Sequence, residues 1–172
     1  MNRFVKAFLV ILAVMLAATT MFAVQPKANI SVTANISPNC LISANTLAFG
    51  NYDELGLNST TDLAQTTTIS VQCVDEMTAS VSLDQGLYPK SGSTHDVPQR
   101  QMQCTDQDGS FLAYFLYQDA NHQVVWGDGA NNTEPVTSDG VAHNYTVYGV
   151  VPHGQMGEAE SYSDTVVATV LY

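Results

Sequence analysis

The sequence predicts an all-β fold of the sandwich type, formed by one domain that follows an export signal. Short runs rich in β-branched and aromatic residues alternate with turn clusters, a spacing typical of sandwiches and barrels. After the first two dozen residues, no segment of useful length shows the periodicity of an amphipathic helix. The roughly 150 residues that remain are enough for one domain with a hydrophobic core.

Residues 1–23 have the composition of a secretory signal peptide. Arg3 and Lys6 form a basic start, and the apolar run of residues 7–18 follows them. This run is shorter than the roughly 20 residues that a membrane span requires. We therefore expect cleavage near Ala23, export, and no membrane span in the mature chain. The alternative is an N-terminal anchor that stays uncleaved.

The first strand-like segment of the mature chain is Ala28–Ile36, within an arm at residues 24–37. Apolar and polar residues alternate here without interruption, as expected for a strand with one buried face. Nine residues at ~3.3 Å each give a strand of about 30 Å, long enough to cross a sandwich. The apolar face consists of Ala28, Ile30, Val32, Ala34 and Ile36. On pattern alone, the segment is equally well explained as the first strand of its own sheet.

Strand character then recurs along the chain. Leu41–Phe49 is a predicted strand, and the alternating run Thr66–Val74 is followed so closely by Ala79–Leu83 that we expect a hairpin. The composition of residues 84–110 predicts a long loop with one short strand at most. Phe111–Tyr117, the most aromatic run, is a predicted central strand.

The last third of the sequence predicts three further strands. A turn at residues 119–122 leads into Val124–Trp126, and Asn144–Val151 and Ser161–Tyr172 follow. In the last segment, one alternating face is formed by Val166, Ala168, Val170 and Tyr172. We expect this strand to lack a neighbour, which would leave an open edge and an open core.

The mature chain is strongly acidic. Three basic residues remain after removal of the signal, Lys27, Lys90 and Arg100, against sixteen acidic ones, an excess of thirteen negative charges. We expect a surface that repels phosphate backbones and anionic lipid heads, because basic residues hold such ligands. Nucleic acid is therefore not an expected partner.

Three cysteines in an exported chain predict one disulfide and one remaining thiol. We pair Cys40 with Cys73, since each lies beside a strand-like run and both lie in the first half of the chain. Closing a loop of this size stabilises a fold by roughly 3–4 kcal/mol in the chain-entropy model. Cys104 lies in a polar stretch that reads as an exposed loop, where it is either a free thiol or a point of intermolecular pairing.

No catalytic or metal-binding pattern occurs in the sequence. The histidines are scattered among loop-like segments: His95, His122, His143 and His153. Their spacing is not that of zinc ligands, and no HExxH, CxxC or GxSxG sequence occurs. We therefore predict no enzyme activity, no metal site and no cofactor. Trp126, before a Gly-Asp-Gly turn, is interpreted as a core anchor rather than as an exposed platform for sugars.

An ordered series of motifs resembles the spore coat protein U domain. The motifs are SPNCLIS (37–43), LAFGNYD (47–53), ISVQC (69–73), VSLDQG (81–86), LYQDA (116–120), WGDG (126–129), YTVYG (145–149) and SYSDTV (161–166). They cover nearly all of the mature chain, and their order is more specific than any single motif. The family includes the Csu-type subunits of archaic chaperone–usher pili. Cys104 and the glutamine-rich residues 99–103 depart from the family pattern.

The resemblance implies an incomplete immunoglobulin-like sandwich, the pilin fold, over residues 38–172, with the Cys40–Cys73 disulfide. It also implies that the arm, residues 24–37, is a donor strand. A periplasmic chaperone would lend a strand to an open groove beside the terminal strand, and an outer-membrane usher would exchange it for the arm of another subunit. Backbone hydrogen bonds give such strand addition its affinity, and alternate apolar side chains fill pockets.

The sequence thus predicts a structural subunit of a surface pilus or fimbria that polymerises by donor-strand exchange and supports adhesion and biofilm formation. It would pass through the periplasm to the cell surface. The expected partners are a periplasmic pilus chaperone, an outer-membrane usher, and copies of itself or sister subunits. Two alternatives are a secreted, self-complete sandwich that binds surfaces through Trp126, and a coat component of a spore or cell envelope.

Overall fold

The computed structural model describes residues 25–106 and 109–172. The predicted signal peptide, residues 1–23, lies outside the described residues. The chain divides into two units, residues 1–35 and residues 36–172, and every strand among the described residues belongs to the second. No described residue belongs to a helix long and apolar enough to cross a membrane.

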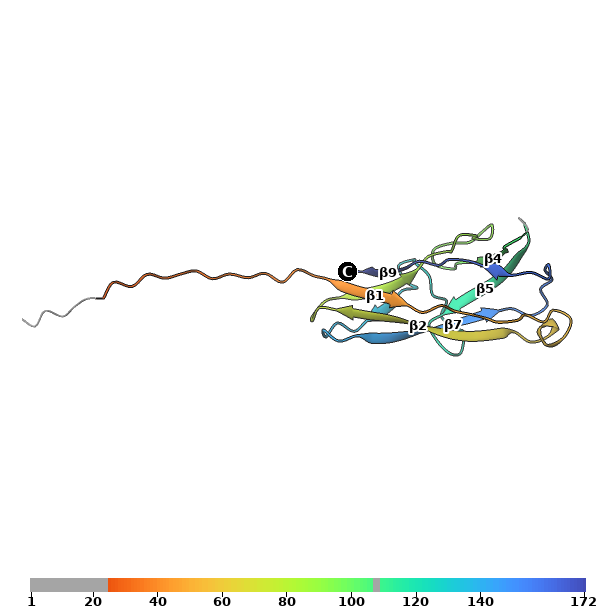
Figure 1. The fold of residues 1–172 in the computed structure, drawn as a ribbon, viewed down its shortest axis with the longest axis horizontal. Helices are drawn as coiled ribbons and strands as arrows, with labels where there is room; N and C mark the ends of the chain where they lie inside the picture. The colour runs from red at the N-terminus through yellow and green to blue at the C-terminus, as the bar shows by residue number, and fades with distance from the viewer. Residues whose placement is uncertain (1–24, 107–108) are drawn as a thin grey trace, which may run out of the picture. The chain divides into compact units, whose positions relative to one another are not determined.

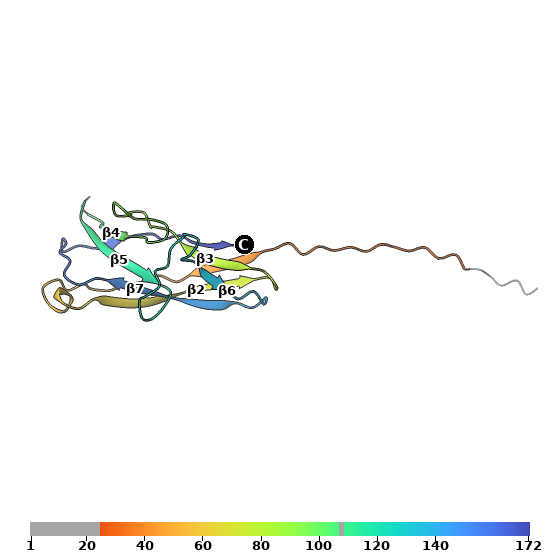
Figure 2. The ribbon, with the colours of Figure 1, turned by 180° about the vertical axis from the view of Figure 1, so that it is seen from behind.

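The second unit is an all-β structure with two antiparallel sheets (Figure 1). In spatial order, the larger sheet contains β1 (Cys40–Ala44), β2 (Leu63–Cys73), β7 (His143–Val151), β5 (Phe111–Tyr117), β4 (Arg100–Cys104) and β8 (Tyr162–Ser163). The smaller sheet contains β6 (Glu134–Val136), β3 (Ala79–Leu83) and β9 (Ala168–Leu171). Figure 2 shows the smaller sheet from the other side. Within the described ranges, the helical content is one 3-10 turn at Leu57–Ser59.

The core lies between the sheets and is centred on the pairing of β2 with β7. Their register runs from Leu63 opposite Val151 to Val71 opposite His143. Alternate residues of both strands point inward, and Ile69, Val71, Val147 and Val151 are all buried. β-branched residues suit this position, because their branched side chains pack well on a pleated surface. Across the core, β3 is buried at four of its five residues.

The expected hairpin between the second and third strands is wrong. β2 pairs with β1 and β7 in the larger sheet, whereas β3 pairs with β6 and β9 in the smaller one. The connection instead carries the chain from one sheet to the other. Glu76 adopts a left-handed conformation with φ 60°, and its N–H donates to Ser138 O at 3.2 Å. This hydrogen bond ties the turn to the segment after β6 rather than to a neighbouring strand of a hairpin.

The predicted single strand Ser161–Tyr172 is also wrong. It is divided into β8, which pairs with β4, and β9, which pairs with β3, so that the segment passes from one sheet to the other. Between β8 and β9, carboxylate groups accept backbone N–H groups that would otherwise pair with a neighbouring strand. Asp164 accepts the N–H groups of Leu87 and Thr165, and Asp84 accepts that of Val167.

The expected exposure of Cys104 is wrong as well. Cys104 is a free cysteine at the end of β4 and is only 4% exposed. The glutamine-rich stretch forms a strand in which Arg100 and Cys104 are buried, while the residues between them are intermediate. The polar composition of this stretch predicted a loop. In a half-buried strand, however, alternate side chains point away from the core, so polar residues can stand between Arg100 and Cys104.

The predicted disulfide is confirmed. Cys40 and Cys73 face each other across β1 and β2, and their sulfur atoms are bonded at 2.07 Å. The bridge fixes the first residue of β1 to the last residue of β2, with a sequence separation of 33. It therefore fastens an edge strand that has one neighbour within its sheet.

Replacing both cysteines, Cys40→Ala with Cys73→Ala, is expected to lower the free energy of unfolding by roughly 3–4 kcal/mol, because the unfolded chain regains its loop entropy. Urea unfolding at neutral pH measures the difference. Reductant should destabilise the wild-type protein by a similar amount and leave the double variant unchanged. A loss below about 1 kcal/mol would contradict this account.

A contact between Asp62 and His153 joins the start of β2 to the loop after β7. The Asp62 carboxylate accepts the backbone N–H of His153 at 2.8 Å and contacts the ring Nδ1 at 2.6 Å. The backbone hydrogen bond first, and then the ring contact, lower the pKa of Asp62 below its usual value. Both side chains are about half exposed, so solvent weakens the interaction.

Asp62→Asn is expected to lower the free energy of unfolding at pH 6 by less than about 1 kcal/mol. The lowered pKa contributes stability above the unfolded-state pKa, about 3.9, and this contribution is lost as pH falls through the folded-state pKa. Urea unfolding at pH 6 and pH 3 should therefore show a smaller difference from wild type at pH 3. A difference that grows at low pH would refute the assignment.

A candidate strand-binding groove

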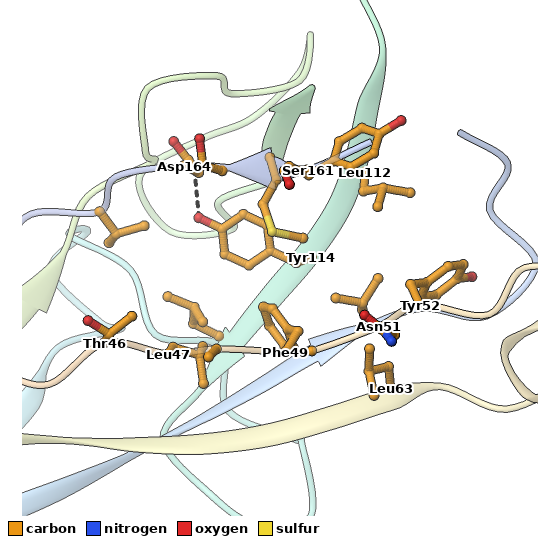
Figure 3. Close-up of a pocket in the computed structure, with 18 of the residues that line it drawn as sticks. Thr46, Leu47, Phe49, Asn51, Tyr52, Leu63, Leu112, Tyr114, Ser161 and Asp164 are labelled. Carbon is orange, nitrogen blue, oxygen red and sulfur yellow. Dashed lines mark hydrogen bonds between the residues drawn. The ribbon is translucent and has the colours of Figure 1, made fainter. Parts of the chain in front are cut away.

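An open groove of about 1030 Å³ lies in the second unit (Figure 3). One wall is the segment 44–55, which begins at the last residue of β1. The other wall is the segment 157–166, which contains β8, together with Ala168 at the start of β9. Five strands supply the floor, and its apolar side chains are Leu63, Ile69, Leu83, Met102, Leu112, Leu116, Val147 and Val151. The groove thus opens onto the core.

The walls lack the strand neighbours that would close the sandwich. Residues 45–55 form no strand, and in the described sheets β8 pairs only with β4 and β9 only with β3. An edge of this kind presents backbone N–H and C=O groups to an added strand. The groove therefore combines an apolar floor with two backbone edges, which is the arrangement that strand addition requires.

A glycine positions the first wall. The side chains of Leu47 and Phe49 press onto β7 at Gly149, where an added Cβ would lie 2.6 Å from Leu47 Cδ2 and 2.9 Å from Phe49 Cζ. The Phe49 ring also meets Tyr114 edge-on, with the ring centroids 6.1 Å apart. A side chain at position 149 would push this wall away from the floor, so the width of the groove depends on this glycine.

A partly buried hydrogen bond positions the second wall. The Tyr114 hydroxyl on β5 donates to Asp164 Oδ2 at 2.6 Å, and Figure 3 shows this contact at the groove. Burial, and then the hydrogen bond to Asp164, raise the pKa of Tyr114 far above its usual value. The hydroxyl therefore stays protonated and keeps donating. The contact holds the crossing between β8 and β9 against the larger sheet.

Asp84 and Arg100 also stabilise the segment between β8 and β9, from the end of β3. The backbone N–H of Asp84 donates to Val167 O at 3.1 Å, and its carboxylate accepts the Val167 N–H at 2.9 Å. Arg100 is buried, and its guanidinium donates to the carbonyls of Leu83, Asp84 and Trp126. Burial lowers the pKa of Arg100 from its usual value. Arg100, expected among the surface charges, instead fixes the end of β3.

The structure brings only some of the predicted site residues to the groove. Val166 and Ala168 line it, whereas Val170 and Tyr172 do not, and Tyr172 is exposed. The predicted donor residues Ala28, Ile30, Val32, Ala34 and Ile36 are exposed and lie outside regular secondary structure. Their function as a strand, and that of the groove edge, stay predictions.

Trp126 is not available as a binding platform. Its side chain is 1% exposed, and its ring N–H donates to Val81 O at 3.0 Å. The interpretation as a core anchor is confirmed, and the alternative of a surface-binding module that uses Trp126 is wrong. No cluster of three metal-ligating side chains occurs in residues 25–106 and 109–172.

The polar residues that shape the groove were not predicted from the sequence. Tyr114, Asp84 and Asp164 come from three separate segments, and no local pattern predicts that they lie close together. One signal was available: Asp84 and Asp164 both lie in motifs that resemble the family, at positions where a strand ends.

Tyr114→Phe is expected to lower the free energy of unfolding by about 1–3 kcal/mol, because the partly buried Asp164 carboxylate loses its hydroxyl donor. Amide hydrogen exchange of residues 164–168 should accelerate at the same time, since the second wall loses its tie to β5. Tyr88→Phe, which removes a hydroxyl outside the groove, is the control. Unchanged exchange at residues 164–168 would show that this bond does not hold the wall.

Comparison with known proteins places these features in a family. The Spore Coat Protein U domain family matches residues 27–169. Protein U of Myxococcus xanthus is 41% identical over 126 residues, which are 72% of this chain and 70% of that protein.

Two solved structures share the fold. One is the CsuC–CsuE chaperone–tip adhesion subunit pre-assembly complex of Acinetobacter baumannii, with a TM-score of 0.56 and 20% identity over 80% of this chain. This chain spans only 40% of that one. The other is a chaperone–usher pilus, with a TM-score of 0.53 and 15% identity over 90% of this chain and 99% of that chain. The predicted all-β, immunoglobulin-like pilin fold is confirmed.

Proposed function

The chain belongs to the spore coat protein U domain family, and on this premise we propose that it is a structural subunit of a surface pilus. Subunits join by donor-strand exchange, in which the arm at residues 24–37 of one copy fills the groove of another. The observation that carries this proposal is the open groove, with its apolar floor and two walls that pair with no strand on the side facing the groove in the described sheets.

The arm has the chemistry that the groove requires. Its apolar face alternates strictly over Ala28–Ile36, and its large members Ile30, Val32 and Ile36 are exposed. Burying a valine or isoleucine side chain contributes about 1.5–3 kcal/mol. Three such side chains, together with backbone hydrogen bonds to the walls, offset the cost of ordering the arm. The polar face, which includes Ser31 and Thr33, points to solvent in this arrangement.

The proposal defines the partners and the route. A periplasmic chaperone fills the groove before assembly, an outer-membrane usher catalyses the exchange, and copies of this chain or sister subunits follow. The protein acts mechanically, without enzyme activity. It passes through the periplasm to the cell surface, where the fibre supports adhesion and biofilm formation. The A. baumannii complex, which contains a chaperone and a tip adhesion subunit, supports the chaperone as a partner class.

A coat component of a spore or cell envelope is the second candidate. It is favoured by the family description and by 41% identity to Protein U of M. xanthus. The two candidates differ in the length of the assembly. A pilus subunit forms linear fibres that extend from the cell, whereas a coat component stays in an envelope layer. Electron microscopy of cells labelled with an antibody to this protein distinguishes them.

Val32→Asp is expected to block fibre growth, because a charge on the apolar face of the arm cannot enter an apolar groove. Ser31→Asp, on the opposite face, should be tolerated. The measurement is the ladder of multimers in unheated detergent electrophoresis of the exported protein, together with electron microscopy. Deletion of residues 24–37 provides the fully blocked reference.

Equal effects of Val32→Asp and Ser31→Asp would refute the assigned faces of the arm. Normal polymerisation of the deletion variant would refute donor-strand exchange through this arm. Export of every variant is checked by its amount in the periplasm, so that a folding defect is not mistaken for an assembly defect.

A further inference from the structure

The tether between the arm and the sandwich is short. Only Ser37, Pro38 and Asn39 separate Ile36 from the first residue of β1. Three residues span at most about 10 Å. If the arm of one copy fills the groove of another, which is the proposed function, the sandwich of the first copy must therefore sit against one end of that groove.

The symmetry of the contact between two copies determines at which end of the groove the donor copy sits. β1 begins at Cys40 beside Cys73, and the segment after it runs along the groove to residues 52–55 at the opposite end of the sandwich (Figure 1). A donor copy seated at the end where β1 begins would meet its acceptor through the same surface on both copies. Such a contact closes into a dimer, whereas a head-to-tail contact produces an open fibre. In a fibre, the donor copy therefore sits at the end formed by residues 52–55.

That end carries an exposed apolar surface. Leu55, Leu57 and Met156 are 83%, 67% and 70% exposed, and we call them the end patch. Scattered single apolar residues on a surface are ordinary, but these three come from adjoining loops. Leu55 also lines the groove, so the end patch is continuous with the site that receives the arm.

Hydrogen bonds hold the two loops of the end patch together. The N–H of Gly154 donates to Asn58 O at 2.8 Å, and that of Gly157 donates to Glu54 Oε2 at 3.0 Å. The Tyr52 hydroxyl donates to Pro152 O at 2.8 Å. The end patch is therefore built on a preformed support, which lowers the entropic cost of docking.

We propose that the end patch docks the sandwich of the next copy of this chain, at the end of that copy where β1 begins. The facing end has exposed apolar side chains of its own, Leu41 and Val141. These lie close together, because Gln72 is paired with Leu41 and donates to Gly140 O. The contact follows insertion of the arm and sets the angle between successive sandwiches.

Charge makes this contact depend on the arm. The end patch adjoins Glu54 and Glu158, and the facing end has Asp75 and Glu76, so both partners are acidic. Like charges oppose free association, and salt screens them. The short tether compensates, because it makes the contact intramolecular and raises the effective concentration of the two surfaces.

Cross-linking in assembled fibres tests the proposal. Met156→Cys combined with Val141→Cys, treated with a short bis-maleimide, is expected to give a ladder of covalent multimers that survives heating in detergent. Met156→Cys combined with Leu87→Cys is the matched control, because Leu87 is exposed but lies outside the end patch. Adding Leu57→Glu to the first pair should reduce the multimer yield several-fold while fibres still form. Adding Val97→Glu should leave the yield unchanged.

Fibres without covalent multimers from the 156/141 pair would overturn the docking proposal and leave the pilus function intact. Equal yields from the 156/141 and 156/87 pairs would overturn it too. Absence of fibres from the wild-type chain would instead overturn the proposed function, and the docking proposal with it. Retained yield in the Leu57→Glu variant would exclude the end patch as the docking surface.

Discussion

The fold depends on how the segment between β8 and β9 crosses from one sheet to the other. Backbone groups that leave one ladder before they join the next need other partners, because unpaired buried polar groups are costly. Asp84 and Asp164 supply these partners, and Tyr114 ties Asp164 to the larger sheet. The crossing can therefore stay in place while the space beside it remains open.

An open groove with fixed walls favours strand addition for an entropic reason. Gly149 lets one wall pack close to the floor, and the Tyr114–Asp164 bond holds the other. Since both walls are already ordered, the conformational cost of binding falls mainly on the incoming strand. In the proposed function, the same groove accepts a chaperone strand first and a subunit arm later.

Local patterns in the sequence predicted some of the strands but not their partners; the predicted strand Val124–Trp126 forms only an isolated bridge at Val125, and β6 was not predicted. Ala79–Leu83 and Phe111–Tyr117 match their predicted bounds, because period-2 alternation and aromatic content are local properties. The crossings at Glu76 and Asp164 were missed, since side chains from distant segments satisfy the backbone there. The groove could be inferred only through family resemblance, because its floor and walls come from segments spread over more than a hundred residues.

The acidity of the chain bears on how a fibre of such subunits holds together. Sandwiches with a large excess of negative charge repel one another, so their surfaces alone give little cohesion. The arm escapes this penalty, because its residues from 28 to 36 are uncharged. In the proposed fibre, affinity therefore resides in the uncharged strand, and the proposed patch of three apolar side chains suffices at the junction because the tether brings the two surfaces together. Repulsion between the remaining surfaces then favours an extended chain over lateral clumping.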